Sequence, residues 1–403
     1  MQDNFDFVVV GAGIAGLSAA YFLSQSARVA VIEREATPGC HASGRSAAVF
    51  IEAYDNPTVS DLSLQSKPFF SSPPAGFTDY PLVQPLGGLM LIRPDETTVA
   101  ADYLAKWSER CPKLGLITTK EAVERVPILK RSAIAGAIYD PNLMAIDTNQ
   151  LMQCFLRGIR KNGGKLFCNT DVRLTRTPAN LWQVSGADIS FASPTLINAG
   201  GAWANDIANS AGIATLPITP CRRTAFIIDI TTAGFGGKAP PWPMVRTLRQ
   251  DLYFKPEDPG LLISPQDETP APACDAQPEE LDIAIAANRF EILCQFKVSS
   301  IRSSWAGLRS ITPDRRPLIG PSDDEQFIWL AGQGGAGFQT SPAVGQLIAD
   351  VLLHGKTVPK DVDPKRFTGQ ENASELQLGL MKLVAIFRHK FLSGNFFAAG
   401  PLF

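Results

Sequence analysis

Glycine and acidic residues near the start of the chain have the types and spacing that binding a nucleotide phosphate requires. Residues 11–16 read Gly-Ala-Gly-Ile-Ala-Gly, and Glu33 follows after two apolar stretches. In such a turn Gly11 permits a tight bend, Gly13 lets the backbone approach a pyrophosphate, and Gly16 lets the next helix lie close to the strand. The start of that helix would offer unpaired N–H groups to the phosphates, and Glu33 would accept hydrogen bonds from ribose hydroxyls.

The segments around this turn are those that would position it. Residues 5–10 form an apolar, β-branched run that predicts a buried strand, and residues 17–23 have helical spacing. Residues 28–32 predict a second strand that ends at Glu33. A purely structural glycine turn is the alternative, but strand, helix and acid in register favour a dinucleotide fold.

Two later segments repeat this geometry. A predicted strand at 195–198 is followed by Ala-Gly-Gly-Ala-Trp at 199–203 and a helix to Ala211. Another strand, at 327–331, precedes a glycine-rich turn and a helix from Ser341 to Leu353. Both turns could present N–H groups to a ligand. For the turn after the strand at 327–331, the alternative is a glycine-rich hinge.

The loop after Glu33 consists largely of small residues and contains Arg45. Such a loop could approach a flat ligand, and Arg45 could neutralise a phosphate. A surface loop with a helix cap at Ser43 is an equally good interpretation.

Composition excludes several classes of function. Among 403 residues the net charge is −2, which argues against a nucleic-acid-binding surface. The seven cysteines are scattered without a CxxC pair and the three histidines lie far apart, so we expect no disulfide framework and no metal site, and histidine-based acid–base catalysis would rest on very few candidates. No run of eighteen apolar residues exists, and the first strand begins too close to Met1 for a signal peptide. A cytoplasmic protein with reduced thiols is expected.

The rest of the chain predicts two domains, which the length also favours. Residues 55–145 have a mixed pattern with helices at 97–110 and 120–125, and a helix at 151–162 follows a cap at Asp147 or Thr148. Further strands are expected at 165–168 and 171–172 and in a meander at 182–185 and 188–191. Short strands among proline-rich loops indicate an antiparallel sheet, at 225–230, 252–255 and 261–264.

Taken together, these stretches resemble the flavin-dependent D-amino acid oxidase, glycine oxidase and sarcosine oxidase family, over residues 5 to 368. The resemblance rests on the first glycine turn with Glu33, on Ser-Gly-Arg-Ser-Ala at 43–47, and on the motifs at 198–203, 305–309, 312–314, 317–320 and 332–335. Within the family the chain is most similar to bacterial D-arginine dehydrogenases, through residues 139–141, 156–160 and 242–244.

The resemblance implies an α/β fold in which a Rossmann-like FAD-binding domain is interleaved with an α+β substrate domain built on a mostly antiparallel sheet. The FAD-binding domain would comprise residues 1–78, 144–215 and 306–368, the substrate domain 79–143 and 216–305, and a C-terminal tail 369–403. FAD is the implied cofactor. The positions implied to contact it are Gly11, Gly13, Ile14, Ala15, Gly16, Glu33, Arg34, His41, Ser43, Gly44, Arg45, Ser46, Ala47, Ala48, Val172, Gly201, Trp203, Gly334, Gly335, Gly337, Phe338, Gln339 and Thr340.

For the substrate, the resemblance assigns Arg223 and Arg309 to an amino acid carboxylate, with Tyr54 and Tyr253 as hydroxyl donors. Arginine binds a carboxylate better than lysine does, because its planar guanidinium can donate two parallel hydrogen bonds to it. The alternatives are a surface ion pair for Arg223 and a tyrosine at the edge of the core for Tyr253. The implied chemistry is hydride transfer from Cα to flavin N5, followed by hydrolysis of the imino acid to a 2-oxo acid and ammonia.

The chain departs from D-arginine dehydrogenases in the pocket. Gly88 replaces a carboxylate that would hold the substrate guanidinium, Val49 replaces a histidine, and Ile51 replaces a small polar residue. A buried substrate cation without an anionic partner is costly, so neutral or apolar side chains are expected in preference to D-arginine and D-lysine. If Arg246 borders the pocket, a substrate with an acidic side chain becomes possible. The alternative is that Arg246 lies in a solvated loop. The remaining expected pocket residues are Met244, Phe338 and Gln339.

The tail has apolar residues near helical spacing, at Leu376, Leu380, Leu383, Val384, Phe387 and Phe391. It could lie on a membrane and deliver electrons to quinone, or pack on the protein's own body or a partner subunit. Oxygen is the other expected electron acceptor.

Two further alternatives stay open. One is an enzyme acting on glycine or on a secondary amine such as sarcosine or an opine, within a hetero-oligomer; the other is an electron-transfer subunit without turnover. An NAD-dependent dehydrogenase is disfavoured because the second glycine turn and the Ser-Gly-Arg loop have no evident role in one.

Overall fold

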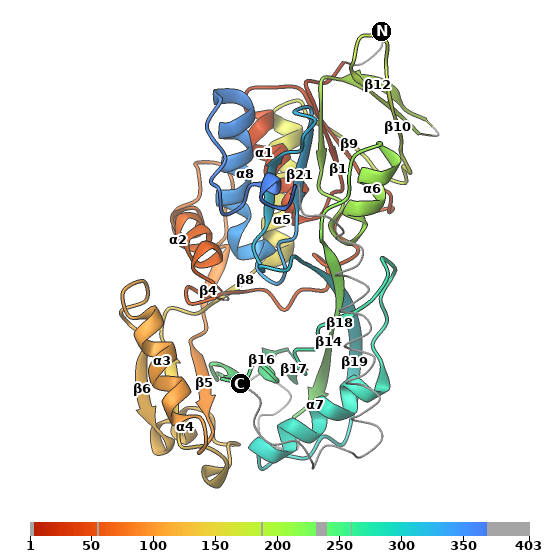
Figure 1. The fold of residues 1–403 in the computed structure, drawn as a ribbon. Coiled ribbons are helices and arrows are strands. Elements are labelled where there is room, and N and C mark those ends of the chain that lie inside the picture. Colours follow the sequence, from red (N-terminus) through yellow and green to blue (C-terminus); the bar gives the residue numbers. More distant parts are fainter. Residues whose placement is uncertain (1–3, 55, 187, 231–239, 259, 369–403) are drawn as a thin grey trace.

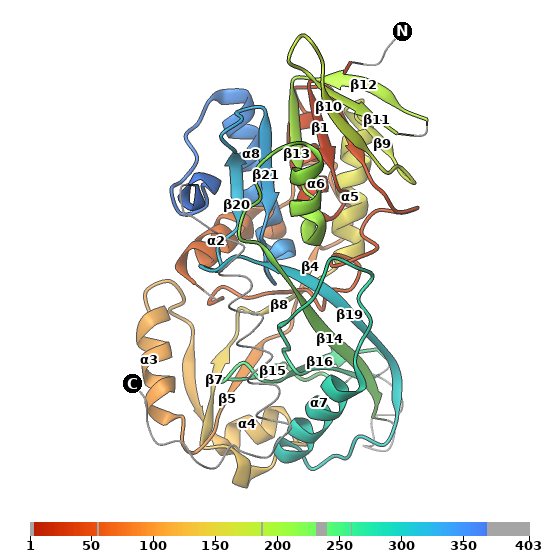
Figure 2. The ribbon, with the colours of Figure 1, turned by 45° about the vertical axis from the view of Figure 1, so that its right-hand side comes forward.

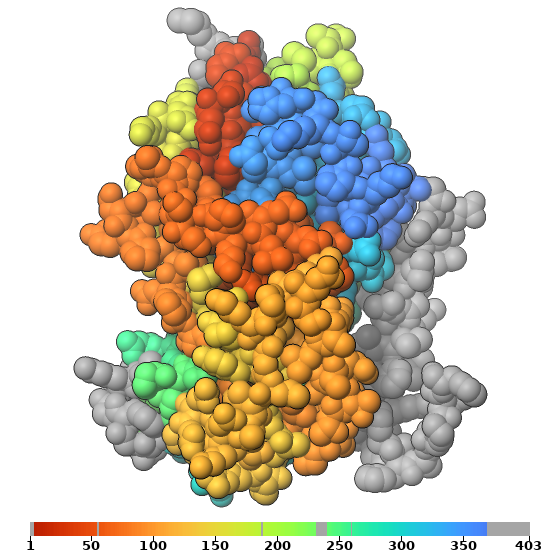
Figure 3. Space-filling view, turned by 90° about the vertical axis from the view of Figure 1, so that its left-hand side faces the viewer, coloured from red at the N-terminus to blue at the C-terminus, as the bar shows by residue number. Residues whose placement is uncertain are grey.

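The protein has two lobes joined by several passages of the chain (Figures 1 and 2). The computed structural model describes residues 4–54, 56–186, 188–230, 240–258 and 260–368. The prediction for the C-terminal tail falls on residues outside this part. The segment at 57–71, orange in Figure 3, belongs to the first lobe and lies on its side toward the second lobe on the face shown there.

The first lobe is built on a mainly parallel sheet of short, largely apolar strands. Its strands run in the order β20 (Leu318–Pro321), β21 (Phe327–Ala331), β13 (Thr195–Asn198), β1 (Phe7–Val10), β2 (Val29–Ile32) and β9 (Lys165–Phe167). Only the β20–β21 pair is antiparallel among these described neighbours. Strands buried on both faces are expected to be apolar throughout, as β1 is.

Alternate side chains of these strands enter two separate cores. Val9, Val31 and Ile197 pack against one helical layer, made of α1 (Ile14–Ser24), α2 (Pro57–Ser71), α5 (Thr148–Lys161) and α8 (Gly337–His354). Their neighbours Val8 and Ala30 point the other way, toward α6 (Ala204–Ser210) and the antiparallel sheet of β10 (Arg173–Arg176), β11 (Trp182–Ser185) and β12 (Ser190–Ser193). This division arises because successive side chains of a strand point to opposite faces of the sheet.

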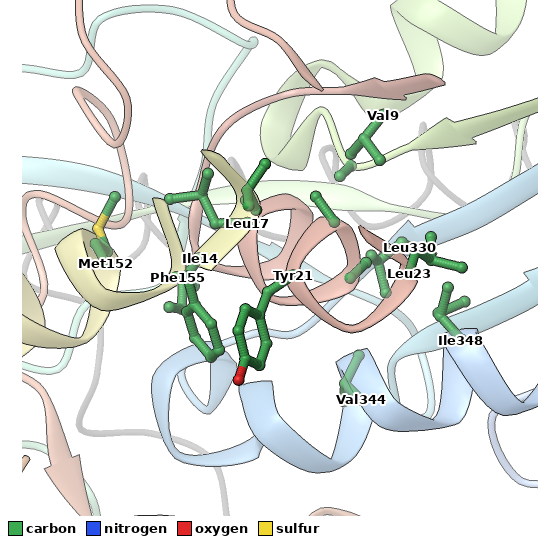
Figure 4. Packing of buried hydrophobic residues seen from close by; sticks show 14 of the residues in the cluster. Val9, Ile14, Leu17, Tyr21, Leu23, Met152, Phe155, Leu330, Val344 and Ile348 are labelled. Carbon is green, nitrogen blue, oxygen red and sulfur yellow. The ribbon is translucent and has the colours of Figure 1, made fainter. Parts of the chain in front are cut away.

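Aromatic and aliphatic side chains between α1, α5 and α8 fill the helical core (Figure 4). The rings of Tyr21 and Phe155 lie 5.4 Å apart, and Val344 and Ile348 of α8 face Leu23 (Figure 4). This packing fixes the starts of α1 and α8 relative to the sheet.

Helix α8 begins at Gly337, earlier than the expected Ser341, and contains Pro342. Proline leaves the carbonyl of Phe338 without its helical N–H partner, and the Ser341 hydroxyl donates to that carbonyl over 2.9 Å. The local hydrogen bond allows the helix to continue through the proline.

The second lobe is a larger, mostly antiparallel sheet. Its strands run in the order β18 (Thr269–Pro270), β14 (Thr219–Asp229), β17 (Gly260–Ser264), β16 (Tyr253–Glu257), β15 (Met244–Thr247), β5 (Gly88–Ile92), β7 (Gly136–Asp140) and β6 (Gly115–Thr118), and β19 (Ile301–Ile311) pairs with β14. One face packs on α4 (Thr119–Arg125) and α7 (Glu280–Leu293). Part of the other face packs on α3 (Thr97–Trp107) and the rest faces the first lobe.

A small sheet of β3 (Val49–Phe50), β8 (Met144–Ile146) and β4 (Val83–Pro85) lies where the chain passes between the lobes. Short 3₁₀ turns occur at Arg131–Ala133, Gly201–Trp203 and Pro364–Phe367. Among the described residues, no helix is long and apolar enough to cross a bilayer, and no group of histidine, cysteine and acidic side chains is arranged to hold a metal ion.

The predicted fold class is confirmed, and so is the N-cap of α5, where the Asp147 carboxylate accepts from the N–H of Gln150 over 2.8 Å. Several elements were not anticipated, among them α2, α7, the strands β5, β6, β7, β15 and β20, and the long strand β19. The expectation of a strand at 171–172 was wrong, since β10 begins at Arg173. No helix begins at Ser43, so the suggested cap of a local helix there is wrong; the chain forms turns at that position.

Candidate functional site

Two adjoining cavities lie at the ends of the strands of the first sheet, on the side that faces the second lobe. The larger, of about 400 Å³, opens where β1, β2 and β13 end, and the smaller, of about 130 Å³, lies between the start of α8 and the second lobe. Both are lined by Gly13, Ser43, Arg45 and Gly201. A ligand longer than one cavity could therefore extend through both.

The first glycine turn has the close contacts that its sequence implies. Gly11 has a φ of +106°, and a Cβ there would lie 2.5 Å from the carbonyl oxygen of Ala199. A Cβ on Gly16 would overlap the carbonyl oxygen of Gly11. Any side chain at either position would therefore push α1 away from the sheet.

Polar groups around this turn hold its N–H groups in place. The N–H of Ala12 donates to the Glu33 carboxylate over 2.8 Å, and the N–H of Ile14 donates to the Ser43 hydroxyl over 3.0 Å. Ser43 thus caps α1 from the following loop, which is the structural reason for a serine at that position.

Four side chains form a cluster, of which Arg34, His41 and Trp203 line the larger cavity. The Arg34 guanidinium lies 4.5 Å from the centre of the Trp203 ring, and the His41 ring also lies 4.5 Å from it. Glu35 joins the two basic groups, at 3.2 Å from Arg34 and 2.9 Å from His41. The hydrogen bond from His41 lowers the pKa of Glu35, so this carboxylate stays charged.

The cavities have the features of a dinucleotide cradle. Gly201 and Gly334 have φ values of +56° and +54°, and a Cβ at either would meet no described heavy atom within 4 Å. Since both glycines line the cavities, side chains there would project into the ligand space. The buried Nδ1 of His41 and Nε2 of Gln333 also have no hydrogen-bond partner among the described residues. Open backbone together with such orphaned polar atoms fits a large polar ligand.

Arg45 lines both cavities but has protein partners. Its Nη1 donates to the carbonyl oxygens of Ala276 and Ala306 over 2.9 and 2.8 Å, and its Nη2 pairs with Asp275. Arg45 therefore ties the Ser-Gly-Arg loop to the second lobe. The expected role in neutralising a phosphate stays a prediction.

The smaller cavity brings together the expected substrate-binding groups from separate strands. Arg223, Tyr253 and Arg309 line it from β14, β16 and β19. A Cβ on Gly335 would overlap the hydroxyl oxygen of Tyr54 and lie 2.6 Å from Nη1 of Arg309. Tyr54 and Arg309 thus meet at the glycine turn that precedes α8.

Arg223 is a buried cation beside a second cation. Its Nε donates to the carbonyl oxygen of Asp267 over 2.7 Å, and its Nη2 lies 2.9 Å from Glu268. Burial, and then the nearby charge of Arg309, lower the pKa of Arg223 to about 10. Both guanidinium groups are still charged at neutral pH, which makes this cavity attractive to an anion. The alternative of a surface ion pair is wrong.

An apolar wall continues from these groups. Ile51, Met244, Tyr253 and Leu143 pack in one cluster, with Val49 and Tyr54 against it. Gly88 lies between Met244 and Asp140 in the sheet, and a Cβ there would be 2.7 Å from Cδ1 of Leu143. Leu143 therefore covers the place where a longer side chain at position 88 would lie.

Arg246 is not in a solvated loop. It belongs to β15, is partly buried, and donates from Nη2 to the Tyr103 hydroxyl over 3.2 Å. Asp140, on the same face of the sheet, is buried, and burial raises the pKa of its carboxyl group. Arg246 and Asp140 partly offset each other's charge.

Several expected ligand-contacting residues line neither cavity. Gln339 and Thr340 are buried inside α8, and Gly16 and Gly44 make close contacts with their own turns. The full set comprises Gly16, Gly44, Ala48, Gln339, Thr340, Tyr54, Val49, Ile51, Gly88, Met244 and Arg246; the other expected positions line one cavity or both.

Some lining residues were not anticipated, among them Thr170, Asp171, Asp206, Gly307, Leu308 and Gln333. Gln333 had a signal in the sequence, because it stands inside a glycine turn already expected to face a ligand. Asp206 had a weaker one, as an acid in the first turn of α6.

Comparison with known proteins identifies the family. The model of the FAD-dependent oxidoreductase family named DAO matches residues 6–351. This chain belongs to that family. FAD is accordingly its cofactor, and the glycine cradle and orphaned polar atoms fit FAD.

Relatives of this FAD-dependent oxidoreductase include mouse mitochondrial dimethylglycine dehydrogenase, 23% identical over 91% of this chain but 44% of the relative's own length. The chain thus spans less than half of that relative. Glycine oxidase of Bacillus licheniformis is 23% identical, over 88% of this chain and 94% of its own.

Solved structures agree on the fold. Glycine oxidase from Geobacillus kaustophilus has a TM-score of 0.79 at 22% identity, covering 92% of this chain and 100% of its own. L-proline dehydrogenase from P. horikoshii has a TM-score of 0.78 at 25% identity, covering 91% and 98%. Likeness at this level shows the fold and not the substrate.

Proposed function

We propose that the protein oxidises the amine of a free D-amino acid, giving an imino acid that water hydrolyses to a 2-oxo acid and ammonia. The bound FAD supplies the hydride acceptor, at flavin N5. The observation that carries the proposal is the convergence of Arg223, Arg309 and Tyr253 on a cavity adjoining the dinucleotide cradle. Amine oxidation itself agrees with the family and with its relatives.

The chain's own residues would orient the substrate. Arg309 and Arg223 hold the carboxylate, and two guanidinium groups in a partly dry cavity select an anion strongly. Tyr54 and Tyr253 add hydroxyl donors. Fixing the carboxylate at one point fixes the position of Cα, so the protein contributes orientation to the oxidation.

A neutral side chain is the best fit to the apolar wall. Of this cluster Ala225 and Tyr253 line the smaller cavity, while Ile51, Met244 and Leu143 are buried behind them and, like Gly88, contribute no charge. Asp140 is the acid beside this wall, and the nearby charge of Arg246 partly offsets its charge. We therefore expect D-arginine and D-lysine to be poor substrates, because their cations would be buried without a full counter-charge.

A secondary amine or glycine is the second candidate. Similar proteins include dimethylglycine dehydrogenase, glycine oxidase and iminodiacetate oxidase, whose names all specify small amines. Another relative is a subunit of hydrogen cyanide synthase, which supports a hetero-oligomer as an alternative assembly. Oxygen or a quinone would accept the electrons.

An anaerobic substrate panel tests the proposal. The FAD-loaded protein is mixed with D-leucine, D-methionine, D-arginine, D-lysine, their L-enantiomers, glycine and sarcosine, and loss of oxidised-flavin absorbance is followed. Fast bleaching by D-leucine and D-methionine is expected. Faster bleaching by D-arginine would refute the pocket argument, and bleaching by glycine or sarcosine alone would favour the second candidate.

A further inference from the structure

Arg223 of the smaller cavity is held by the two residues that immediately precede β18. Its Nε donates to the carbonyl oxygen of Asp267 over 2.7 Å, and its Nη2 donates to Oε1 of Glu268 over 2.9 Å. Its remaining nitrogen atom, Nη1, has no hydrogen-bond acceptor among the described residues. One edge of this guanidinium group is therefore occupied by the protein, while the group lines the cavity.

Glu268 is itself held by a second arginine. Nη1 and Nη2 of Arg315 donate to its two carboxylate oxygens over 2.9 and 3.0 Å. Two parallel hydrogen bonds fix the orientation of a carboxylate better than one does. Although burial opposes its charge, the hydrogen bonds and charge of Arg315 and the nearby cations of the cavity lower the pKa of Glu268, so this carboxylate stays charged.

The turn that carries Arg315 is also held in place. Arg315 has a φ of +58°, a left-handed conformation that residues other than glycine rarely adopt. Its N–H donates to the carbonyl oxygen of Thr312 over 2.9 Å, and the side-chain amide of Asn56 donates to its own carbonyl oxygen over 2.9 Å. Since Asn56 lies two residues after Tyr54, this turn contacts both sides of the proposed carboxylate site.

Stability alone does not explain the pair of Glu268 and Arg315. Their side chains are 31% and 41% exposed, and ion pairs in contact with water contribute little to the stability of a fold. On its inner side, however, Glu268 contacts Arg223, whose side chain is 10% exposed. The position of Arg223 is therefore what depends most on Glu268.

We propose that Glu268, held by Arg315, is a positioning residue that keeps the guanidinium group of Arg223 directed at the substrate carboxylate. This inference rests on the proposed function, in which Arg223 binds that carboxylate. Glu268 also brings a negative charge close to an anion site. If it acted through its charge alone it would weaken carboxylate binding, whereas a positioning residue strengthens that binding.

Binding of 4-methylpentanoate, which is leucine without its amine, to the FAD-loaded protein distinguishes these two effects. Glu268→Leu removes both acceptor oxygens and should weaken binding about tenfold at neutral pH, because Arg223 is then held only through Nε. Glu268→Gln keeps one acceptor for Nη2 and should weaken binding only about threefold. If charge alone mattered, both variants would bind the carboxylate more tightly than the wild type. Spectral titration of the flavin measures the binding.

The pH dependence of this binding gives a second readout. Burial and the charge of Arg309 lower the pKa of Arg223, and the groups that raise it are Tyr253, Glu268 and Tyr54. Without the carboxylate at position 268, Arg223 loses its proton more readily, so carboxylate binding should be lost at a lower pH in Glu268→Leu than in the wild type. An unchanged midpoint would show that Glu268 does not act on Arg223 and would overturn the proposal.

Glu257→Leu is the matched control, and it should bind the carboxylate as the wild type does. Glu257 belongs to the same lobe, is 40% exposed, pairs with Lys255 and lines neither cavity. Equal or tighter binding in Glu268→Leu overturns the proposal, and if that variant does not hold FAD, equal or tighter binding in Glu268→Gln does so. Absence of binding to the wild type would instead contradict the carboxylate site of the proposed function, and the positioning role with it.

Discussion

The two cavities are built in different ways, although they adjoin. The larger is made mainly from four turns that follow strands β1, β2, β9 and β13 of the parallel sheet, with Cys274 and Leu308 added from farther along the chain, so most of its lining is local in sequence. The smaller joins the start of α8 to β14, β16 and β19 of the other lobe, which are distant along the chain. The cofactor end of the site is therefore encoded in local turns, and the substrate end depends on how the two lobes meet.

Neighbouring arginines on β14 show the consequence. Arg222 points to the α7 side, where it pairs with Asp282 at 2.8 Å and with Glu279. Arg223 points to the cavity, as alternation along a strand requires. Two adjacent residues of one type thus have different tasks, and only the pairing of the strand distinguishes them.

The largest expected effect is on substrate turnover, from a substitution in the smaller cavity that should leave FAD binding in the larger one unchanged. Arg309→Met should lower kcat/KM by about 10³-fold, because losing one partner of a buried charge pair costs roughly 2–5 kcal/mol. FAD affinity should stay unchanged. Steady-state kinetics and flavin fluorescence measure the two quantities, and Arg302→Met, on the exposed part of the same strand, is the control. Loss of FAD binding in the Arg309 variant would show that the cavities are not separable.

A substitution at the cofactor end should have the converse effect. Gly16→Ala places a Cβ on the carbonyl oxygen of Gly11, and overpacking of about 1–3 kcal/mol should weaken FAD binding by up to about 100-fold. Titration of the apoprotein with FAD measures this. Gly115→Ala is the control, since a Cβ there meets no described heavy atom within 4 Å. Equal affinities in the two variants would contradict the tight-turn argument.

A smaller effect is expected from the hydroxyl donors. Tyr253→Phe removes one hydrogen bond to the carboxylate, worth about 1 kcal/mol, and should raise KM by about five- to tenfold. Tyr139→Phe, on the opposite face of the same sheet, should leave KM unchanged. A fall in FAD affinity without a change in KM would assign Tyr253 to the cofactor instead.

The smallest effect concerns pH. Burial and Arg309 lower the pKa of Arg223 to about 10, so its charge is complete below that pH and is lost as the pH rises through it. Binding of a carboxylate inhibitor should therefore weaken at high pH, by about fourfold at pH 10.5 for a group with this pKa. Spectral titration of the flavin measures the binding, and Arg223→Met should abolish the alkaline step. A step that persists in the variant belongs to another group.

The same local-versus-distant division governs what the sequence alone can predict. The strands at 195–198 and 327–331 have the predicted bounds, because short apolar runs ending in glycine turns are local signals. Helix α7 was missed since it carries exposed Leu281 and Ile292, so its apolar residues do not keep to one face. Strand β19 becomes evident only through its pairing with β14.

Individual side chains of the site follow this rule as well. The glycine positions of the cradle could be predicted from spacing, whereas the choice between Gln333 and Gln339 could not. Gln339 is occupied because Ile51 and Ser63, far away in sequence, supply its partners. Such long-range hydrogen bonds leave no pattern around the glutamine itself.

Comparing an amino acid with its own decarboxylated amine tests the central claim most directly. The FAD-loaded protein is mixed anaerobically with the best amino acid of the panel, or with the amine that has the same side chain but no carboxylate, and flavin bleaching is timed. If the paired guanidinium groups hold a carboxylate beside the flavin, the amino acid bleaches it at least 100-fold faster, as losing about 3 kcal/mol of charge-assisted binding implies. Equal rates for the amine, or no bleaching by any amino acid, would contradict the account.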